Sequence, residues 1–284
     1  MRKFPDVEEL VLGKNVKIEE NVSIKGKKIV IGEGTVIRHG TTINVSEYLE
    51  IGKKSIIGEN NRIRGRDIRT GREFYSNHSA EIGGGSCFEK RSKLTTGYWF
   101  HLGSYGIINT AMEVKIGNEV GMGRFTNIYT HGAYQSILKG FPVTFGPINI
   151  GNNVWMPGAT VNPNVNIGDN VVIGVGSLVL KDLPSGCLAA GVPCRIIREK
   201  CFPKKISLEQ KRKIIEQINN LWDLGMKHQR DGIYKVDDAY IDFENVRLTG
   251  NSSKRSERAR SILRRHGVRF KVDIIDGEYR EWFS

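Results

Sequence analysis

Long apolar runs and CxxC cysteine pairs are absent from this sequence of 284 residues. No stretch of eighteen apolar residues occurs, so no membrane-spanning helix is expected. The opening residues MRKFPDVEEL lack the apolar core of a secretory signal, and we therefore expect a cytoplasmic protein. The cysteines form no CxxC pair, which predicts reduced thiols at Cys87, Cys187, Cys194 and Cys201.

Leucine is sparse over roughly the first 200 residues, whereas isoleucine and valine are frequent. The 33 glycines recur at intervals instead of clustering, and this combination favours β structure with many turns. The formal net charge of +12 suits an anionic partner. That partner is a nucleic acid, a phosphorylated small ligand or an anionic membrane surface, and composition does not choose among the three.

Aliphatic residues recur every six positions, often directly before a glycine. Clear runs of this period are Ile31, Ile37 and Ile43; Ile51, Ile57 and Ile63; and Ile167, Ile173 and Val179. A period of six would scatter side chains around an α-helix, but it suits short strands that alternate with corners. Stacked triangular coils would bury these residues against one another, which predicts an all-β solenoid, a parallel β-helix. A β-sandwich fits less well because its turn signals come every eight to twelve residues.

The six-residue period is interrupted over residues 64–80, 97–113 and 129–147. The third interruption is wholly out of register. A long excursion from a rigid solenoid is usually a functional loop, so we expect a catalytic loop at about residues 129–147.

The repeat stops near residue 200, which predicts a solenoid domain, residues 1–200, and a small C-terminal α+β extension, residues 201–284. Ser207 is a candidate N-cap, with Gln210 three residues later, for an amphipathic helix. Within the extension, we expect helices over 207–230 and 255–266 and strands over 233–248 and 268–276.

Three motifs near the end of the repeat carry a family resemblance: IGNNVW at 150–155, GSLVLKDLP at 176–184 and AAGVPCRIIRE at 189–199. They resemble the hexapeptide-repeat acetyltransferases, most closely the galactoside, maltose and xenobiotic acetyltransferase group. The resemblance implies a left-handed β-helix, a homotrimer, and acetyl-CoA bound in the groove between neighbouring subunits. The extension after about residue 200 matches nothing in that family.

His131, in the tetrapeptide YTHG, opens the out-of-register loop. The resemblance implies that it is the catalytic base, because the family places a histidine there, upstream of the IGNNVW coil. Imidazole side chains titrate near neutral pH and suit the removal of a proton from an attacking hydroxyl or amine. The thioester of acetyl-CoA is already activated, so direct transfer without an acyl-enzyme is expected. A solvent-exposed loop histidine is the competing interpretation.

The resemblance also implies a set of cofactor-binding residues. The matching positions are Trp155, Gly158, Val175, Leu180, Lys181, Arg195 and Arg198. The three cations would meet the diphosphate and 3′-phosphate of coenzyme A, and the backbone of the glycine, valine and leucine would follow its pantetheine arm. The stretch WMPGATVNPNVNIG is one residue shorter than is usual in the family, which bears on the Gly158 match.

The acceptor pocket is expected to differ from that of the galactoside group. An asparagine that lies near the acetyl group there is replaced by Gly103 or Ser104, and Asn109 is nearby but off register. Aromatic rings stack well on sugars, so four residues are candidates for binding the acceptor: Tyr98, Trp99, His101 and Tyr105.

These features predict an acetyl-CoA-dependent O-acetyltransferase that acts on a sugar or glycan precursor. N-acetylation of a nucleotide-linked amino sugar is the alternative acceptor chemistry. A γ-type carbonic anhydrase shares the β-helix, but no two histidines here have its spacing of five, and we expect no metal.

The remaining alternative is a non-catalytic protein that binds nucleic acid or a membrane through residues 251–271. Those residues hold eight Lys and Arg and one acidic residue, Glu257. Nucleic acid is the less favoured partner, and peripheral membrane contact stays open.

Overall fold

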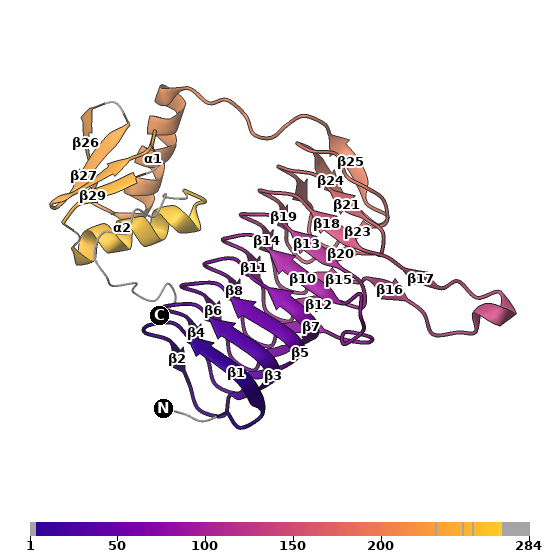
Figure 1. Cartoon of the computed structure of the whole chain (residues 1–284). Helices are drawn as coiled ribbons and strands as arrows, with labels where there is room; N and C mark the ends of the chain where they lie inside the picture. The colour runs from indigo at the N-terminus through magenta and orange to yellow at the C-terminus, as the bar shows by residue number, and fades with distance from the viewer. Residues whose placement is uncertain (1–3, 231, 246, 252, 269–284) are drawn as a thin grey trace. The chain divides into compact units, whose positions relative to one another are not determined.

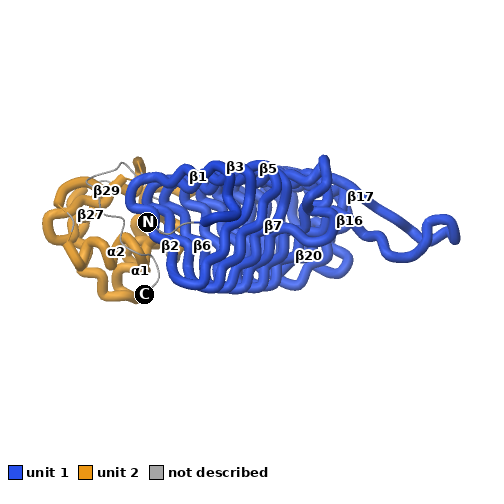
Figure 2. Tube along the Cα trace, turned by 60° about the horizontal axis from the view of Figure 1, so that its bottom comes forward, with its two compact units in different colours: residues 1–203 blue, residues 204–284 orange. Residues whose placement is uncertain are grey.

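A computed structural model describes residues 4–230, 232–245, 247–251 and 253–268. The chain divides into two compact units, residues 1–203 and residues 204–284, coloured separately in Figure 2. Each unit has its own hydrophobic core, and each is described by itself.

Unit 1 is a stack of parallel coils (Figure 1). Four long strands begin one sheet: β1 (Val7–Leu12), β3 (Ser23–Ile31), β5 (Thr42–Ile51) and β7 (Arg62–Arg69). The sheet then continues as two runs of short strands. We call the first column β10 (Lys93–Thr96), β13 (Val114–Ile116), β18 (Ile148–Ile150) and β21 (Asn166–Ile167). The third column is β9 (Glu81–Gly83), β12 (Ile107–Asn109), β15 (Asn127–Ile128), β20 (Thr160–Val161) and β23 (Leu178–Val179).

A separate ten-stranded sheet forms the second column. Its members are β2 (Lys17–Ile18), β4 (Val36–Ile37), β6 (Ile56–Ile57), β8 (Tyr75–Ser76), β11 (His101–Leu102), β14 (Gly121–Met122), β19 (Trp155–Met156), β22 (Val172–Ile173), β24 (Leu188–Ala190) and β25 (Arg195–Arg198). All pairings within it are parallel except that of β24 with β25. Each coil passes through the first, second and third columns in turn.

The predicted aliphatic ladder holds the coils together. In the third column, Ile82 pairs in register with Ile108, which pairs with Ile128. All three are at most 2% exposed. Corners between strands place residues at positive φ, such as Asn153 and Asn170, whose side chains hydrogen-bond to each other at 3.2 Å. The predicted fold class, an all-β solenoid built as a parallel β-helix with an α+β extension, is confirmed.

Two of the three expected interruptions are wrong. Residues 64–80 and 97–113 form regular strands of the coils. The aliphatic period is lost there because other residues point inward: Phe74 and Phe100 stack in the core, with ring centroids 5.4 Å apart, and Ser76 is buried beside them. Polar side chains occupy the outward positions, so the polar composition reflects the surface and not a break.

The third interruption is a true excursion. Residues 131–145 form a hairpin of β16 (His131–Gly132) and β17 (Thr144–Phe145), with a short 3₁₀ helix, η1 (Ile137–Lys139), near its tip. The hairpin projects from the coils in both views (Figures 1 and 2). A second long corner, residues 84–92, joins β9 to β10.

Unit 2 contains two helices and a four-stranded antiparallel sheet. Its elements are α1 (Leu208–Trp222), β26 (Lys227–Arg230), β27 (Ile233–Val236), β28 (Ala239–Asp242), β29 (Arg247–Gly250) and α2 (Lys254–Arg265). The predicted Ser207 cap is confirmed as a capping box with Gln210. Among the described residues, no helix is both long and apolar enough to cross a membrane.

The first helix ends eight residues earlier than the predicted 230. Asp223 adopts a left-handed conformation with φ 45°, and Asn219 exchanges hydrogen bonds of 3.0 Å with the backbone of Met226, which turns the chain into β26. The single strand expected over 233–248 is instead three strands, because tight turns reverse the chain. The strand expected over 268–276 lies, after Val268, outside the described residues.

All four cysteines are free thiols, as expected. Burial raises the pKa of the Cys87, Cys187 and Cys194 thiols, which keeps them in the protonated, unreactive form at neutral pH.

Candidate active site

The candidate site lies where the third column turns back into the first. Asn109 is the last residue of β12, and His131 follows β15 in the next coil. Gly83, the last residue of β9, occupies the same corner one coil earlier. Because β9, β12 and β15 pair in register, these corners stack directly on one another. We call this stack the His131 corner.

Asn109 is 4% exposed, and its amide is surrounded by hydrogen-bonding groups that fix its orientation. The Nδ2 group donates to the carbonyl oxygens of Gly83 at 3.1 Å and Gly85 at 3.4 Å. The Oδ1 atom accepts from the Thr130 hydroxyl at 2.6 Å and from the backbone N–H of Thr130 and of Ala111, each at 3.4 Å. Carbonyls can only accept and backbone N–H groups can only donate, so the amide cannot be flipped.

The fixed amide determines the tautomer of the histidine. The Nδ1 atom of His131 lies 2.9 Å from Asn109 Oδ1. Since this oxygen is only an acceptor, Nδ1 must carry the proton. The lone pair of the neutral imidazole is therefore on Nε2, which is the form that a general base requires. Asn109 is thus a positioning residue for His131.

Glycines keep the space around this pair open. A Cβ on Gly84, which has φ +101°, would lie 2.7 Å from Asn109 Nδ2. A Cβ on Gly85 would lie 3.4 Å from His131 Nε2. The run Gly83-Gly84-Gly85 therefore lets two carbonyls reach Asn109 and leaves the lone pair of His131 uncovered.

The hairpin fixes the plane of the imidazole. His131 pairs with Phe145 across β16 and β17, and their rings stack with centroids 5.3 Å apart and planes 19° apart. The Gly146 N–H donates to the Thr130 carbonyl at 2.9 Å and closes the base of the hairpin. His131 is half-buried, with one ring nitrogen bonded and the other directed past Gly85. This arrangement can accept a proton from a molecule that approaches the corner.

The expected cofactor residues gather around the last part of the third column. Leu180 and Lys181 follow β23 at the same corner as His131, two coils later, while Gly158 and Val175 precede β20 and β23. A Cβ on Gly158 would lie 3.7 Å from Val175 Cγ2, so these two are adjacent.

The two arginines lie beside the same coils. Arg195 and Arg198 are exposed on β25. The Cys194 N–H donates to the Leu178 carbonyl at 2.8 Å, which ties the start of that strand to β23. The structure therefore groups the cationic residues at the end of the solenoid.

The expected aromatic residues are not grouped with His131 within one chain. Tyr98 and Trp99 lie at the corner between β10 and β11, and His101 is on β11 in the second column. Trp155, 45% exposed, is on β19 of that column, in register with Gly121 and hence with His101. Tyr105 precedes β12 and stacks on Phe125 at 5.5 Å. The roles assigned to these residues stay predictions.

Sequence reasoning set Asn109 aside as off register, and it missed Thr130, Gly85 and Phe145 as parts of the site. Asn109 and His131 are 22 residues apart, and their contact depends on the length of the coil between them. The three consecutive glycines were the available signal, since no corner of a hexapeptide coil needs three. Among the described residues, no group of three or more His, Cys, Asp or Glu is placed to hold a metal ion.

Comparison with known proteins agrees with the motifs. No protein-family model matches the chain. The galactoside O-acetyltransferase of Escherichia coli K12 is 33% identical over 167 residues, which cover 49% of this chain and 78% of that enzyme.

Two solved structures are similar at lower identity. A maltose O-acetyltransferase from Clostridium difficile 630 gives a TM-score of 0.32 at 22% identity, covering 68% of this chain and 70% of that one. A UDP-N-acetylglucosamine acyltransferase from Campylobacter jejuni gives 0.48 at 18% identity, covering 77% and 84%. Both scores are below 0.5, so the fold rests on the strand pairing described above.

The non-catalytic alternative does not fit a chain that covers most of an acetyltransferase at this identity. Two basic residues of the 251–271 segment are also occupied within unit 2: Arg258 donates to the carbonyls that end α1, and Arg260 pairs with Glu257. From the repeat, the motifs and the galactoside relative together, the chain belongs to the hexapeptide-repeat acetyltransferases.

Proposed function

We propose that this enzyme transfers an acetyl group from acetyl-CoA to a hydroxyl group of a sugar or glycan precursor, with His131 as general base. The observation that carries the proposal is the hydrogen bond of 2.9 Å from His131 Nδ1 to Asn109 Oδ1. That bond leaves the Nε2 lone pair available at an open corner of the solenoid.

The proposed reaction uses one histidine for both proton transfers. The acceptor hydroxyl oxygen attacks the thioester carbonyl carbon while its proton passes to His131 Nε2. The C–S bond then breaks, and the departing sulfur takes the proton back from Nε2. The products are an acetyl ester and the free thiol of coenzyme A, and His131 returns to its starting form. The neutral Asn109 amide holds the ring in place throughout by accepting from Nδ1.

Acetyl-CoA would extend from the His131 corner toward the last coils. Val175 and Leu180 are 79% and 46% exposed, and such apolar side chains suit contact with the pantetheine arm. Lys181, Arg195 and Arg198 are exposed and would meet the phosphates. A homotrimer belongs to this proposal, because a neighbouring subunit would complete the groove. The cytoplasmic location expected from the sequence belongs to it as well.

A thiol-release assay tests the proposal. Purified enzyme is mixed with acetyl-CoA and a panel of sugars, amino sugars and nucleotide-linked sugars. Replacement of a general base costs about 10²- to 10⁴-fold in rate, so His131→Ala should lower kcat by that factor. Binding of acetyl-CoA, measured by calorimetry, should be retained. The panel also separates O-acetylation from N-acetylation.

The matched control is His39→Ala, which removes a partly exposed histidine from an early coil. It should leave kcat unchanged. The proposal fails if His131→Ala retains wild-type turnover with an accepted substrate, or if both histidine variants lose activity equally.

A further inference from the structure

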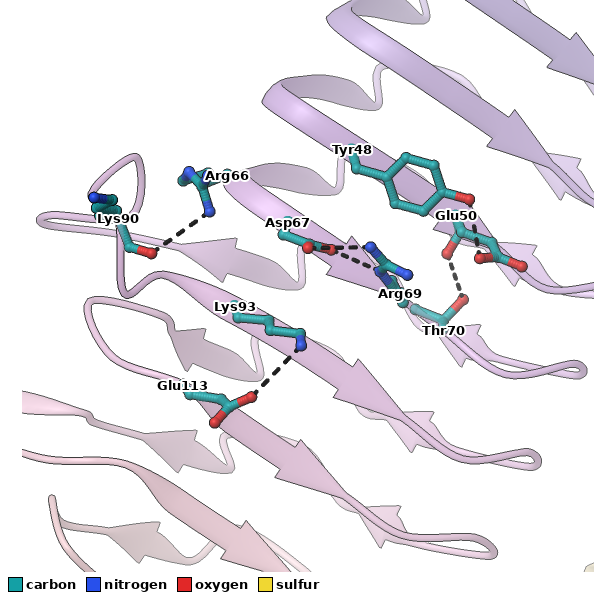
Figure 3. Close-up of polar contacts among 9 residues, drawn as sticks. All are labelled: Tyr48, Glu50, Arg66, Asp67, Arg69, Thr70, Lys90, Lys93 and Glu113. Atoms are coloured by element: carbon teal, nitrogen blue, oxygen red, sulfur yellow. Dashed lines mark hydrogen bonds and ion pairs between the residues drawn. The ribbon is translucent and has the colours of Figure 1, made fainter.

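A pocket of ≈ 370 Å³ lies beside the His131 corner, and all of its charged residues are on coils that precede His131. Its lining residues are Arg66, Lys90, Arg91, Lys93, Met112, Glu113 and Pro147. They come from β7, from the long corner 84–92, from the first-column strand β10, from the turn into β13, and from the residue before β18. Figure 3 shows Arg66 next to Lys90, with Lys93 at the start of β10 and Glu113 just before β13.

Both walls of this pocket are joined to the catalytic histidine. The Met112 N–H donates to the Thr130 hydroxyl at 3.2 Å, and Thr130 directly precedes His131. Pro147 follows Gly146, whose N–H donates to the Thr130 carbonyl at 2.9 Å. On the other wall, Lys90 and Arg91 belong to the same corner as Gly85, which faces His131 Nε2. A ligand in the pocket would therefore contact the segments that hold the base.

The pocket carries an excess of positive charge: four cations and one carboxylate line it. Glu113 is shared between Lys93 at 3.8 Å and Lys115 at 3.1 Å. Within the part of the chain that the structure describes, no carboxylate pairs with Arg66, Lys90 or Arg91.

Arg66 is half-buried, and its guanidinium makes only a long hydrogen bond of 3.5 Å to the Lys90 carbonyl (Figure 3). Its remaining N–H groups are a fork that suits a carboxylate or phosphate. A half-buried cation beside two others, with no carboxylate partner among the described residues, favours an anionic ligand.

We propose that this pocket binds the acceptor, and that the acceptor is an anionic saccharide, with a carboxylate or phosphate held by Arg66, Lys90 and Arg91. This inference rests on the proposed function and names its substrate class. Met112 and Pro147 offer an apolar surface to the sugar ring. The pocket volume suits one or two sugar units, and the anion at one end would place a ring hydroxyl toward His131.

Coenzyme A is the competing anionic occupant. Its expected cations, Lys181, Arg195 and Arg198, lie on coils that follow His131, whereas the cations of the pocket lie on coils that precede it. A single pantetheine arm leads from the thioester to the phosphates in one direction only. The two cationic sites therefore flank the reacting atoms, one for each substrate.

The test compares matched acceptors in the thiol-release assay: neutral hexoses, the corresponding uronic acids and the corresponding hexose phosphates. We expect kcat/KM for the anionic members to exceed that of the neutral sugar by roughly tenfold or more. The uronic acid and phosphate arms identify which anion is preferred. In R66Q/K90Q this preference should disappear through a higher acceptor KM, with the KM for acetyl-CoA unchanged within about twofold.

The control K17Q/K25Q removes two exposed cations from the first coils, so that the total charge changes equally. K17Q/K25Q should keep the preference for anionic acceptors. If R66Q/K90Q folds poorly, Lys90→Gln alone, in an exposed corner, replaces it and should weaken the preference. Any one of three results overturns the inference. The first is an equal kcat/KM for the neutral and the anionic sugars, and the second is a preference that R66Q/K90Q retains. The third is a rise in the KM for acetyl-CoA in R66Q/K90Q in place of a rise in the acceptor KM.

A binding measurement separates failure of this inference from failure of the proposed function. A uronic acid or hexose phosphate, at constant ionic strength, should raise the thermal unfolding midpoint of wild type and of His131→Ala but not of R66Q/K90Q. If no acceptor is acetylated but this protection is seen, the anion site stands and the transferase proposal falls. If neither anionic sugar protects wild type, the anion site falls whatever the enzyme acetylates.

Discussion

The coils on the two sides of His131 offer ligands very different surfaces. The later coils expose both apolar side chains, Val175 and Leu180, and cations, Lys181 and Arg198. The earlier coils instead carry an open cationic pocket around Arg66 and the long corner 84–92. The later surface suits a long, thin ligand with phosphates at its far end, and the earlier one suits a short, charged ligand.

This difference matches where the family motifs lie. IGNNVW, GSLVLKDLP and AAGVPCRIIRE all fall on the later coils, whereas the pocket is built from segments with no such motif. We interpret the later coils as the donor side and the earlier coils as the acceptor side. Three variants can break or sharpen that division.

The largest effect is expected at the boundary between the two sides. Asn109→Ala removes the acceptor for His131 Nδ1 and frees the ring to adopt the other tautomer. We expect kcat to fall by roughly 10- to 100-fold, less than for loss of the base itself, with both KM values nearly unchanged. Steady-state kinetics with saturating acetyl-CoA measures this effect.

The same substitution leaves the buried N–H groups of Thr130 and Ala111 without their partner, so the free energy of unfolding should fall by about 1–3 kcal/mol. Asn149→Ala, in an exposed position on β18, is the control and should change neither kcat nor stability appreciably. A large rise in KM for one substrate, with kcat intact, would mean that Asn109 contacts that substrate and does not act through His131.

An intermediate effect is expected on the donor side alone. The double variant K181Q/R195Q removes two exposed cations of the last coils. We expect the KM for acetyl-CoA to rise by roughly tenfold, because charge-assisted contacts to phosphate are lost, while the acceptor KM stays the same. A raised acceptor KM in this variant would contradict the division into a donor and an acceptor side.

The smallest effect is expected from crowding the base. Gly85→Ala would place a Cβ 3.4 Å from His131 Nε2, a contact that partly covers the lone pair. We expect kcat/KM for the acceptor to fall by a few-fold, about 1 kcal/mol of transition-state stabilisation. Gly132→Ala, next to the same histidine but with no atom within 4 Å of the added Cβ, should have no effect. Equal losses in both would assign the effect to the backbone.

The sequence was sufficient to predict the repeating core of the coils and the loop that the YTHG motif marks. The six-residue period predicted the buried positions of Ile31, Ile37 and Ile43, and the YTHG excursion predicted a loop that carries a histidine. The same period failed at residues 64–80, because Phe74 replaces an aliphatic residue at an inward position. A coil needs an inward side chain of suitable volume, and this need not be isoleucine or valine.

The rest of the site could not be predicted because it is made of contacts between coils. The lengths of two successive coils decide that Asn109 lies under His131, and the corner 84–92 decides that Lys90 lies beside Arg66. A residue pair 22 or 24 positions apart has no local pattern that distinguishes it from its neighbours. The early end of α1 is similar, since it depends on the Asn219 side chain finding the Met226 backbone.

The central claim is that Asn109 holds His131 in the tautomer that leaves Nε2 free to accept a proton. Nitrogen-15 NMR of histidine-labelled enzyme tests it directly, with the His131 signals assigned by their loss in His131→Ala. Above the pH at which the ring is protonated, the account predicts a pyrrole-type shift for Nδ1 and a pyridine-type shift for Nε2, both lost in favour of a tautomer mixture in Asn109→Ala. A pyridine-type Nδ1 and a protonated Nε2 in the wild-type enzyme would contradict it.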